Sequence, residues 1–323
     1  MAEDPIRRSL LAAAALRRRM RGPLREAWPL ELEAWQRVLH HYGKRSTWLP
    51  LAWQRQAVHV LQRPPDDPSL ELEHVDAGGV PCLWIRPRGV DATRVLVYLH
   101  GGGYSIGSVA SHRHYIAKIA AMSGVTGFAV DYRLAPEHPF PAQLEDSLSA
   151  WRWLLGQGFS AERILLAGES AGGGLTMSTL VALRDAGEAL PRAAAVISPW
   201  VDLTLHAPAI DAHARYDYLH RDTLEAYVRR VLPHGDRRDP RISTVFADLS
   251  GLPPLSVQVG AVEALLDDAR TLARRARERG VEVTLREYDD MFHAFQLFPG
   301  LPAAKHANQE LVSFIRRQLG VDG

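Results

Sequence analysis

The sequence contains one cysteine and no long run of apolar residues. A single thiol, Cys82, cannot form a disulfide within the chain, which fits a reducing compartment. Because Cys82 lies in an apolar, strand-like segment, we expect a small core residue there. No apolar segment approaches the length of a membrane span. The best candidate for a signal-peptide core, Leu10–Leu16, runs straight into Arg17-Arg18-Arg19, which favours an amphipathic helix with a basic face. We therefore expect a cytoplasmic protein without stable membrane insertion.

The chain also lacks a strong charge of either sign, internal repeats and low-complexity tracts. Its formal net charge of +1 gives no overall attraction to nucleic acids, so we expect no such partner. The 323 residues are 46% hydrophobic and 23% charged, as in a soluble globular protein that buries a large core. One core with a lid fits this length.

The first 65 residues have the spacing of helices, with breaks at Gly22-Pro23 and Pro29. From Leu70 the apolar period changes to two, and two such segments flank Ala77-Gly78-Gly79 as in a β-hairpin. Strands and helices then alternate, which predicts a mostly parallel sheet covered on both faces. The predicted strands are 70–75, 80–86, 94–99, 126–131, 163–167, 194–197, 255–259 and 283–288, and the predicted helices are 112–123, 143–155, 171–184, 263–279 and 303–319.

Residues 203–250 interrupt this alternation, because they contain helical stretches and turns but no obvious strand. Together with the N-terminal helices they could form a cap over the carboxyl ends of the strands, where sites on such sheets gather. A cap in that place would exclude water and shape a substrate pocket. The predicted organisation is a helical part of the cap (1–65), core (66–202), a cap insertion (203–250) and core again (251–323).

Chemistry is indicated first by Gly168-Glu169-Ser170-Ala171-Gly172, a Gly-x-Ser-x-Gly pattern between a predicted strand and a predicted helix. This pattern is typical of a nucleophile elbow, whose tight turn presents the serine hydroxyl to a base. Three glycines, 101–103, follow another strand, and such a loop leaves backbone N–H groups open to an oxyanion. We assign the oxyanion donors to Gly102, Gly103 and Ala171. A phosphate-cradling loop is the alternative, but the chain has no Gly-Lys-Ser/Thr ending there.

One histidine stands in the position that a general base requires. His293 follows the last predicted strand, as the chain order nucleophile, acid, histidine demands. His100, directly before the three glycines, is expected to orient that loop by a hydrogen bond. Other histidines, His40 and His112 among them, fall in predicted helices or polar loops and are expected to be solvated.

The third partner should be a carboxylate that accepts the other N–H of the histidine. It should follow strand 255–259, where Glu263, Asp267 and Asp268 are available. Glu263 is closest to the end of the strand. Asp267 and Asp268 are expected a turn further along, as ordinary charges at the start of a helix.

Four ordered motifs carry a resemblance to a known family: His100-Gly101-Gly102-Gly103, residues 131–142, residues 168–173 and Ser198-Pro199-Trp200. Over roughly residues 70–320 the chain resembles the bacterial esterases similar to mammalian hormone-sensitive lipase. The resemblance implies an α/β-hydrolase fold with a mostly parallel eight-stranded sheet and a helical cap. It also implies carboxylic ester hydrolysis without a cofactor.

The chain departs from the family pattern at two positions that are not part of the triad. The family usually has aspartate where this chain has Glu169 and asparagine where it has Gly174. Its members commonly carry an aspartate 30 residues before the catalytic histidine, and that position here is Glu263, since 293 − 263 = 30. We therefore assign Glu263 as the orienting acid and keep Asp267 as the alternative acid.

These residues predict a serine carboxylesterase for short- to medium-chain esters. The same groups could act on lactones, carbamates or activated amides, and a ligand-binding protein that has lost the chemistry, or a peptidase, could share the fold. Four aromatic residues could line an acyl or alcohol pocket, although such residues are more often buried in the core: Tyr104, Trp200, Phe292 and Phe295.

Two further expectations concern partners other than the small-molecule ester. The resemblance implies pairing through the last strand, so an exposed edge at Val281–Tyr288 predicts a homodimer. The basic amphipathic N-terminal segment could instead anchor the protein to lipid surfaces.

Overall fold

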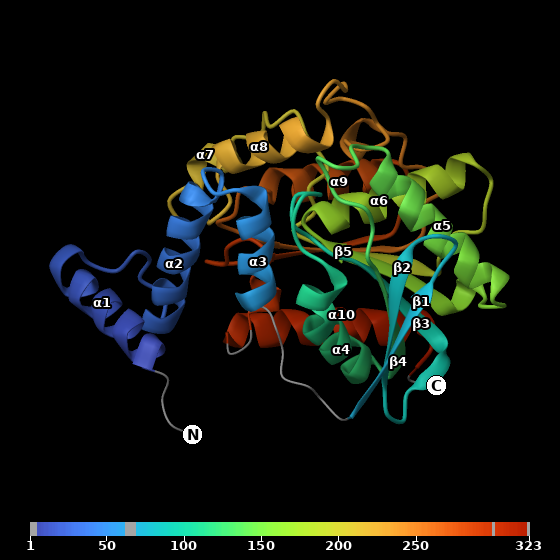
Figure 1. The fold of residues 1–323 in the computed structure, drawn as a ribbon, viewed down its shortest axis with the longest axis horizontal. Coiled ribbons are helices and arrows are strands. Elements are labelled where there is room, and N and C mark those ends of the chain that lie inside the picture. The colour runs from blue at the N-terminus through green and yellow to red at the C-terminus, as the bar shows by residue number, and fades with distance from the viewer. Residues whose placement is uncertain (1–4, 62–68, 299–300, 322–323) are drawn as a thin grey trace.

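A computed structural model describes the whole chain except residues 1–4, 62–68, 299–300 and 322–323. Its centre is an eight-stranded sheet in the order β1-β2-β4-β3-β5-β6-β7-β8 (Figure 1). β1, β2 and β4 pair antiparallel, and all the other neighbours pair parallel, which confirms the predicted fold class. The strands are β1 (Leu70–Asp76), β2 (Pro81–Pro87), β3 (Asp91–Leu99), β4 (Val125–Val130), β5 (Ile164–Glu169), β6 (Ala193–Ile197), β7 (Leu255–Gly260) and β8 (Val283–Tyr288).

Helices cover both faces of this sheet, and the strand residues alternate between the two layers. On β3, Leu96 and Tyr98 pack toward one layer, whereas Val97 and Leu99 pack toward the other. The first layer consists of α4 (Val109–Ser123) and α10 (Pro302–Leu319), below the sheet in Figure 1. The second layer consists of α5 (Ala142–Gly156), α6 (Ala171–Asp185) and α9 (Leu266–Glu278). Because both faces are covered, every residue of β4, β5, β6 and β7 is buried, including the few polar ones.

The remaining helices lie outside these two layers, and we use the word cap for residues 5–61 and 203–250. These helices are α1 (Pro5–Arg21), α2 (Leu30–Ser46), α3 (Leu51–Leu61), α7 (Ala209–Ala212) and α8 (Arg221–Val231). The described chain also contains the short 3₁₀ helices η1 (Ala161–Arg163), η2 (Thr244–Phe246) and η3 (Phe295–Leu297). The two parts of the cap meet at Gly43 of α2, where a Cβ atom would lie 1.9 Å from the carbonyl oxygen of Tyr218. Only glycine allows this approach. Among the described helices, none is long and apolar enough to cross a bilayer.

Two predicted helices begin elsewhere, for identifiable reasons. α4 begins at Val109 because Ser108 caps it: the Ser108 hydroxyl accepts from the N–H of Ser111, and the Ser111 hydroxyl accepts from the N–H of Ser108. α9 begins at Leu266, which leaves Glu263 in the loop after β7. Cys82 is buried in β2, as predicted. The predicted division into cap and core stays a prediction, and its first boundary, at residue 65, lies outside the described residues.

Candidate active site

Ser170 lies in a strained turn between β5 and α6. Its backbone has φ 56° and ψ −123°, a combination that non-glycine residues rarely adopt and that is concentrated at functional sites. The turn needs glycine on both sides. A Cβ atom on Gly168 would lie 2.4 Å from the carbonyl oxygen of Gly172, and one on Gly172 would lie 2.0 Å from that of Leu99. The side chain of Ser170 is therefore held at the start of α6, whose dipole favours negative charge there.

The structure brings Ser170, His293 and Glu263 together. The Nε2 atom of His293 lies 2.9 Å from the hydroxyl oxygen of Ser170, and Nδ1 lies 3.1 Å from Oε1 of Glu263. With a proton on Nδ1, the imidazole donates to the carboxylate and accepts from the serine hydroxyl. Burial lowers the pKa of His293, but the hydrogen bond to Glu263 and the charge of Glu263 together outweigh this effect, so the pKa is raised overall. This arrangement can activate a serine hydroxyl as a nucleophile.

The second carboxylate oxygen of Glu263 is held by its surroundings. Oε2 accepts from the hydroxyl of Ser198 at 2.8 Å and from the N–H of Gly260 at 2.7 Å. Glu263 is completely buried, so these two donors and His293 are what stabilise its charge. Ser198 is also close to the histidine loop, because its hydroxyl oxygen accepts from the N–H of Ala294 at 3.1 Å.

The other two acidic candidates have different partners. Asp267 accepts from the N–H of Ala209 at 2.9 Å, at the start of α7. Asp268 is not the ordinary helix charge that we predicted, because it is buried and accepts from the N–H groups of Val201 and Asp202. Burial raises the pKa of Asp268 well above its usual value. Both carboxylates thus fix the segment after β6 and the cap insertion instead of contacting His293.

The glycine loop after β3 lies beside the elbow. Gly102 has φ +116° and a Cβ atom there would lie 2.1 Å from the carbonyl oxygen of Ile106, while a Cβ atom on Gly103 would enter the ring of Tyr227. The N–H groups of Gly102, Gly103 and Ala171 have no acceptor among the described residues, so they can serve an oxyanion.

A buried ion pair supports this loop from behind. Glu169, next to the nucleophile, accepts from the N–H of Gly101 and from Nε2 of His112, the latter at 2.9 Å. Burial raises the pKa of Glu169 and lowers that of His112, but their mutual attraction is stronger and reverses both shifts. The prediction that His112 is solvated was wrong. His100 donates from Nδ1 to the carbonyl of Gly101 at 2.8 Å, in line with its expected part in orienting the loop.

One acidic residue of the cap was missed by the sequence reasoning. Asp217, completely buried, accepts from the N–H of Ala264 at 2.7 Å with one oxygen. Its other oxygen accepts from the N–H of Tyr218 at 2.7 Å and of His293 at 3.3 Å. Burial raises the pKa of Asp217 to about 6. A cap carboxylate therefore touches the loops of both the acid and the histidine, and no local sequence pattern marks it.

The four aromatic pocket candidates are all buried in the structure. Tyr104 and Trp200 pack near each other, with ring centres 6.1 Å apart. Phe292 and Phe295 belong to a cluster that includes Trp28 of the cap. Their packing is that of core residues, and a role in binding substrate stays a prediction. Within the described part of the chain, no group of three potential ligands is placed to hold a metal ion.

Comparisons with known proteins identify the family of the chain. Residues 96–297 match the model of a family with the description "alpha/beta hydrolase fold". An acetyl-hydrolase of Streptomyces hygroscopicus is 43% identical over 248 residues, which are 76% of this chain and 83% of that protein. An esterase of Acinetobacter venetianus is 32% identical over 253 residues, 77% of this chain and 83% of that protein.

Solved structures of esterases are also similar to this chain. The crystal structure of an esterase from the bacterial hormone-sensitive lipase family is 40% identical, with a TM-score of 0.85 over 91% of this chain and 99% of that one. EstE5 soaked with p-nitrophenyl butyrate is 37% identical, with a TM-score of 0.85 over 91% of this chain and 100% of that one. The chain therefore belongs to the alpha/beta hydrolase fold family, beside the esterases of the bacterial hormone-sensitive lipase family, and is a carboxylic ester hydrolase.

Proposed function

We propose that the protein is a serine carboxylesterase that forms an acyl-enzyme on Ser170. The observation that carries the proposal is the continuous chain of contacts from the Ser170 hydroxyl to Nε2 of His293, and from Nδ1 of His293 to Glu263. The proposed mechanism requires one imidazole nitrogen to contact the serine hydroxyl and the other to contact the carboxylate, and His293 has both contacts.

The first half of the proposed reaction acylates the serine. Nε2 of His293 takes the proton from Ser170, whose oxygen attacks the ester carbonyl carbon. The carbonyl oxygen becomes negative and accepts from the N–H groups of Gly102, Gly103 and Ala171. The imidazolium, stabilised by Glu263, then gives its proton to the leaving alcohol.

The second half releases the acid by the same route. Nε2 of His293 takes a proton from water, and the resulting hydroxide attacks the acyl carbon. The oxyanion forms in the same place, and the proton returns to the oxygen of Ser170 as the bond to the acyl group breaks. Asp217 binds N–H groups on the acid and histidine loops, so it acts through position and not on the substrate.

Short acyl groups are the substrates that the comparisons favour. The similar proteins include an acetyl-hydrolase and, at 34% identity over 70% of this chain and 74% of that protein, an ethyl acetate hydrolase of Pseudomonas putida. We therefore place acetate and butyrate esters first, within the predicted short- to medium-chain range.

A series of p-nitrophenyl esters from acetate to laurate tests this proposal. We expect kcat/KM to be greatest for acetate or butyrate, and the Ser170→Ala variant to lose at least about 10⁴-fold in activity. A maximum at laurate would contradict the acyl preference. A folded protein without turnover of any ester would favour a ligand-binding protein, and faster turnover of lactones or amides would favour those reactions.

A further inference from the structure

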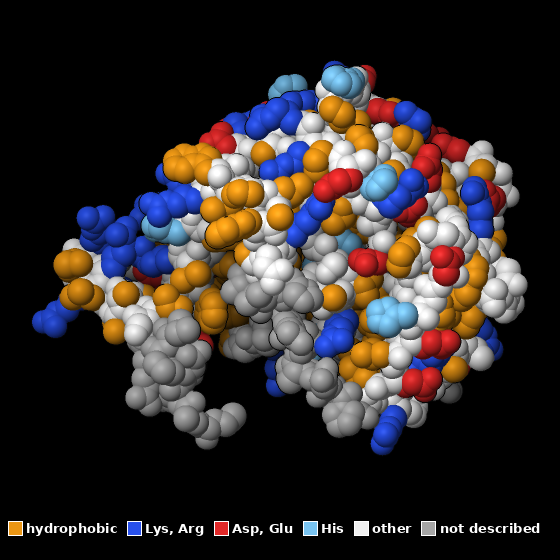
Figure 2. Space-filling view, viewed as in Figure 1, with side chains coloured by type: hydrophobic (Ala, Val, Ile, Leu, Met, Phe, Trp, Pro, Cys, Tyr) orange, Lys and Arg blue, Asp and Glu red, His pale blue; other side chains and the backbone are white. Residues whose placement is uncertain are grey.

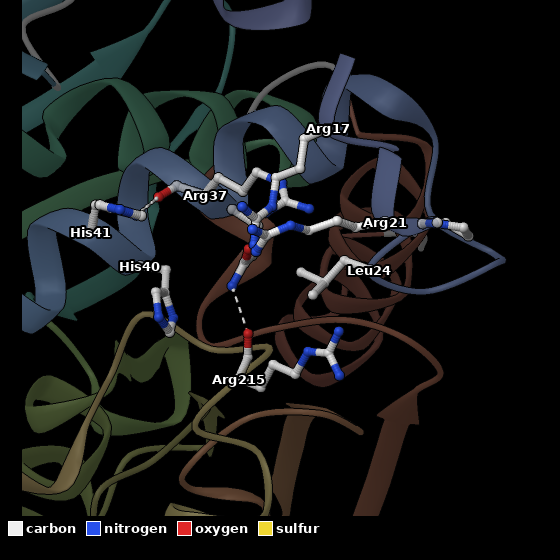
Figure 3. A pocket seen from close by; sticks show the side chains of 10 residues that line it. Arg17, Arg21, Leu24, Arg37, His40, His41 and Arg215 are labelled. Atoms are coloured by element: carbon white, nitrogen blue, oxygen red, sulfur yellow. Dashed lines mark hydrogen bonds between the residues drawn. The ribbon is translucent and has the colours of Figure 1, made fainter. Parts of the chain in front are cut away.

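A hollow in the cap, far from Ser170 in sequence, is lined by cations from three separate segments. The cavity has a volume of about 270 Å³ and lies between α1, α2 and the segment before α8. Its walls include Arg17 and Arg21 of α1, Arg37 of α2 and Arg215. Figure 3 shows the side chains of Arg17, Arg21 and Arg37 pointing toward one another. Leu24 lies next to them, and the side chain of Arg215 lies on the other side of Leu24. Figure 2 shows Lys and Arg side chains gathered over the same part of α1 and α2.

These positive charges exceed the negative charge available to them. Glu33 is buried, its Oε1 atom accepts from Arg37 at 2.5 Å, and its Oε2 atom lies 4.0 Å from Arg18. In the described residues, Arg17, Arg21 and Arg215 form no ion pair with a carboxylate. The charge of Arg37, and then burial and the charge of Arg21, lower the pKa of Arg17.

Positive charges held together in a concave site attract an anion, and the geometry of the guanidinium group indicates the chemical class of that anion. A guanidinium group presents a planar fork of donors that matches the oxygens of phosphate and carboxylate groups. Four such groups with one shared carboxylate leave more positive charge than a single carboxylate ligand would neutralise. The cavity has room for more than a bare phosphate, and Leu24 and Pro23 give it an apolar wall.

We propose that this cavity is a binding site for a phosphate monoester, held by Arg17, Arg21, Arg37 and Arg215. Bound there, the ligand would join α1 and α2 to the segment that precedes Asp217. That segment is already tied to α2, because His40, another residue of the wall, donates from Nδ1 to the carbonyl oxygen of Asp217 at 3.0 Å. The site is independent of the ester chemistry, since none of its arginines contacts the triad.

The phosphate could come from a soluble compound or from a lipid headgroup. The second source has support on the same helix, where Leu16 and Met20 are 61% and 67% exposed. Both sources require the same four arginines, so the test needs one arm for each of them.

Two double variants with equal change in charge provide the test. Arg17→Gln/Arg21→Gln removes two arginines of the cavity, whereas Arg19→Gln/Arg45→Gln removes two exposed arginines of the same helices that do not line it. Titration calorimetry with inorganic phosphate and with glycerol 3-phosphate, at constant ionic strength, should show one site in the wild type. We expect the first variant to bind at least about tenfold more weakly and the second to bind within about twofold of the wild type. Esterase activity on a neutral ester should be unchanged in both.

The second arm is sedimentation with vesicles of phosphatidylcholine, with or without phosphatidic acid. Pelleting that needs both phosphatidic acid and Arg17 with Arg21 would assign the site to a lipid headgroup. Calorimetric binding without pelleting would assign it to a soluble phosphate. The proposal is overturned if the wild type binds neither probe at roughly 10 mM nor the acidic vesicles. It is also overturned if both double variants weaken binding equally, and Arg215→Gln repeats the test away from α1.

Discussion

Replacing Glu263 by glutamine changes one atom at the centre of the proposed site. Three donors converge on this carboxylate: Nδ1–H of His293, the hydroxyl of Ser198 and the N–H of Gly260. A glutamine offers one acceptor oxygen and one NH₂ group, so it cannot satisfy all three. The substitution keeps the size of the side chain and isolates the effect of charge and of hydrogen bonding.

The magnitude follows from the two ways in which the amide can lie. If its NH₂ group faces His293, the imidazole must carry its proton on Nε2, where it cannot accept the proton of Ser170. If its oxygen faces His293, the NH₂ group meets the N–H of Gly260, and a buried donor left unsatisfied costs about 1–3 kcal/mol of stability. In both cases the imidazolium loses its counter-charge. We expect kcat/KM to fall by about 10³- to 10⁴-fold, or roughly 4–5.5 kcal/mol in the barrier.

Hydrolysis of p-nitrophenyl acetate by matched variants provides the assay. Asp267→Asn is the control, because Asp267 accepts from the N–H of Ala209 and an asparagine oxygen can do the same. We expect this control to retain activity within about threefold of the wild type. The assignment would be refuted if Glu263→Gln kept more than about a tenth of the activity, or if Asp267→Asn lost as much as Glu263→Gln.

Four further outcomes test other parts of the account. Gly102→Ala should lower kcat by about 10²- to 10³-fold, because its Cβ atom displaces an oxyanion donor. Gly89→Ala, with positive φ but open space around it, should leave activity unchanged, and equal losses would contradict the assignment. Because His293 must be neutral to accept a proton and its pKa is raised, kcat/KM should fall as pH drops through a value above about 6.5; a midpoint below that would disagree. Asp217→Asn should lower kcat roughly ten- to hundredfold and, because the charge of Asp217 raises the pKa of His293, move that midpoint to lower pH; a purely structural role would leave the midpoint in place. We also propose that β8 (Val283–Tyr288), at the edge of the sheet, pairs two copies of the chain, and light scattering should give about twice the 35.9 kDa of one chain, a result that a monomeric mass would exclude.

The sequence allowed the sheet and the three central residues to be placed, because the relevant signals are local. A Gly-x-Ser-x-Gly turn specifies its own backbone, since Gly168 and Gly172 leave no room for a side chain. The acid and the histidine each follow a strand of one parallel sheet, and the carboxyl ends of such strands meet at one edge. Chain order therefore brought the loop after β7 and His293 to the same edge, and the spacing in the resembling family was needed to choose Glu263 over Asp267.

The supporting residues could not be found in this way, because their partners are distant in the chain and their types are ordinary. Asp217 lies in a cap segment without a motif, and its role depends on N–H groups 47 and 76 residues away. His112 lies on α4 and was expected to be solvated, but it is buried together with the carboxylate of Glu169, with which it forms an ion pair. The arginine cavity likewise exists only after α1 folds against α2, which no periodicity specifies.

The acyl-enzyme is the central claim, and labelling of Ser170 tests it most directly. A fluorophosphonate should add to the protein at one equivalent, with loss of esterase activity in proportion, and peptide mass spectrometry should locate the adduct on Ser170. The Ser170→Ala variant, with its fold verified by circular dichroism, should take up no label. An adduct on another residue, or full activity after complete labelling, would contradict the account.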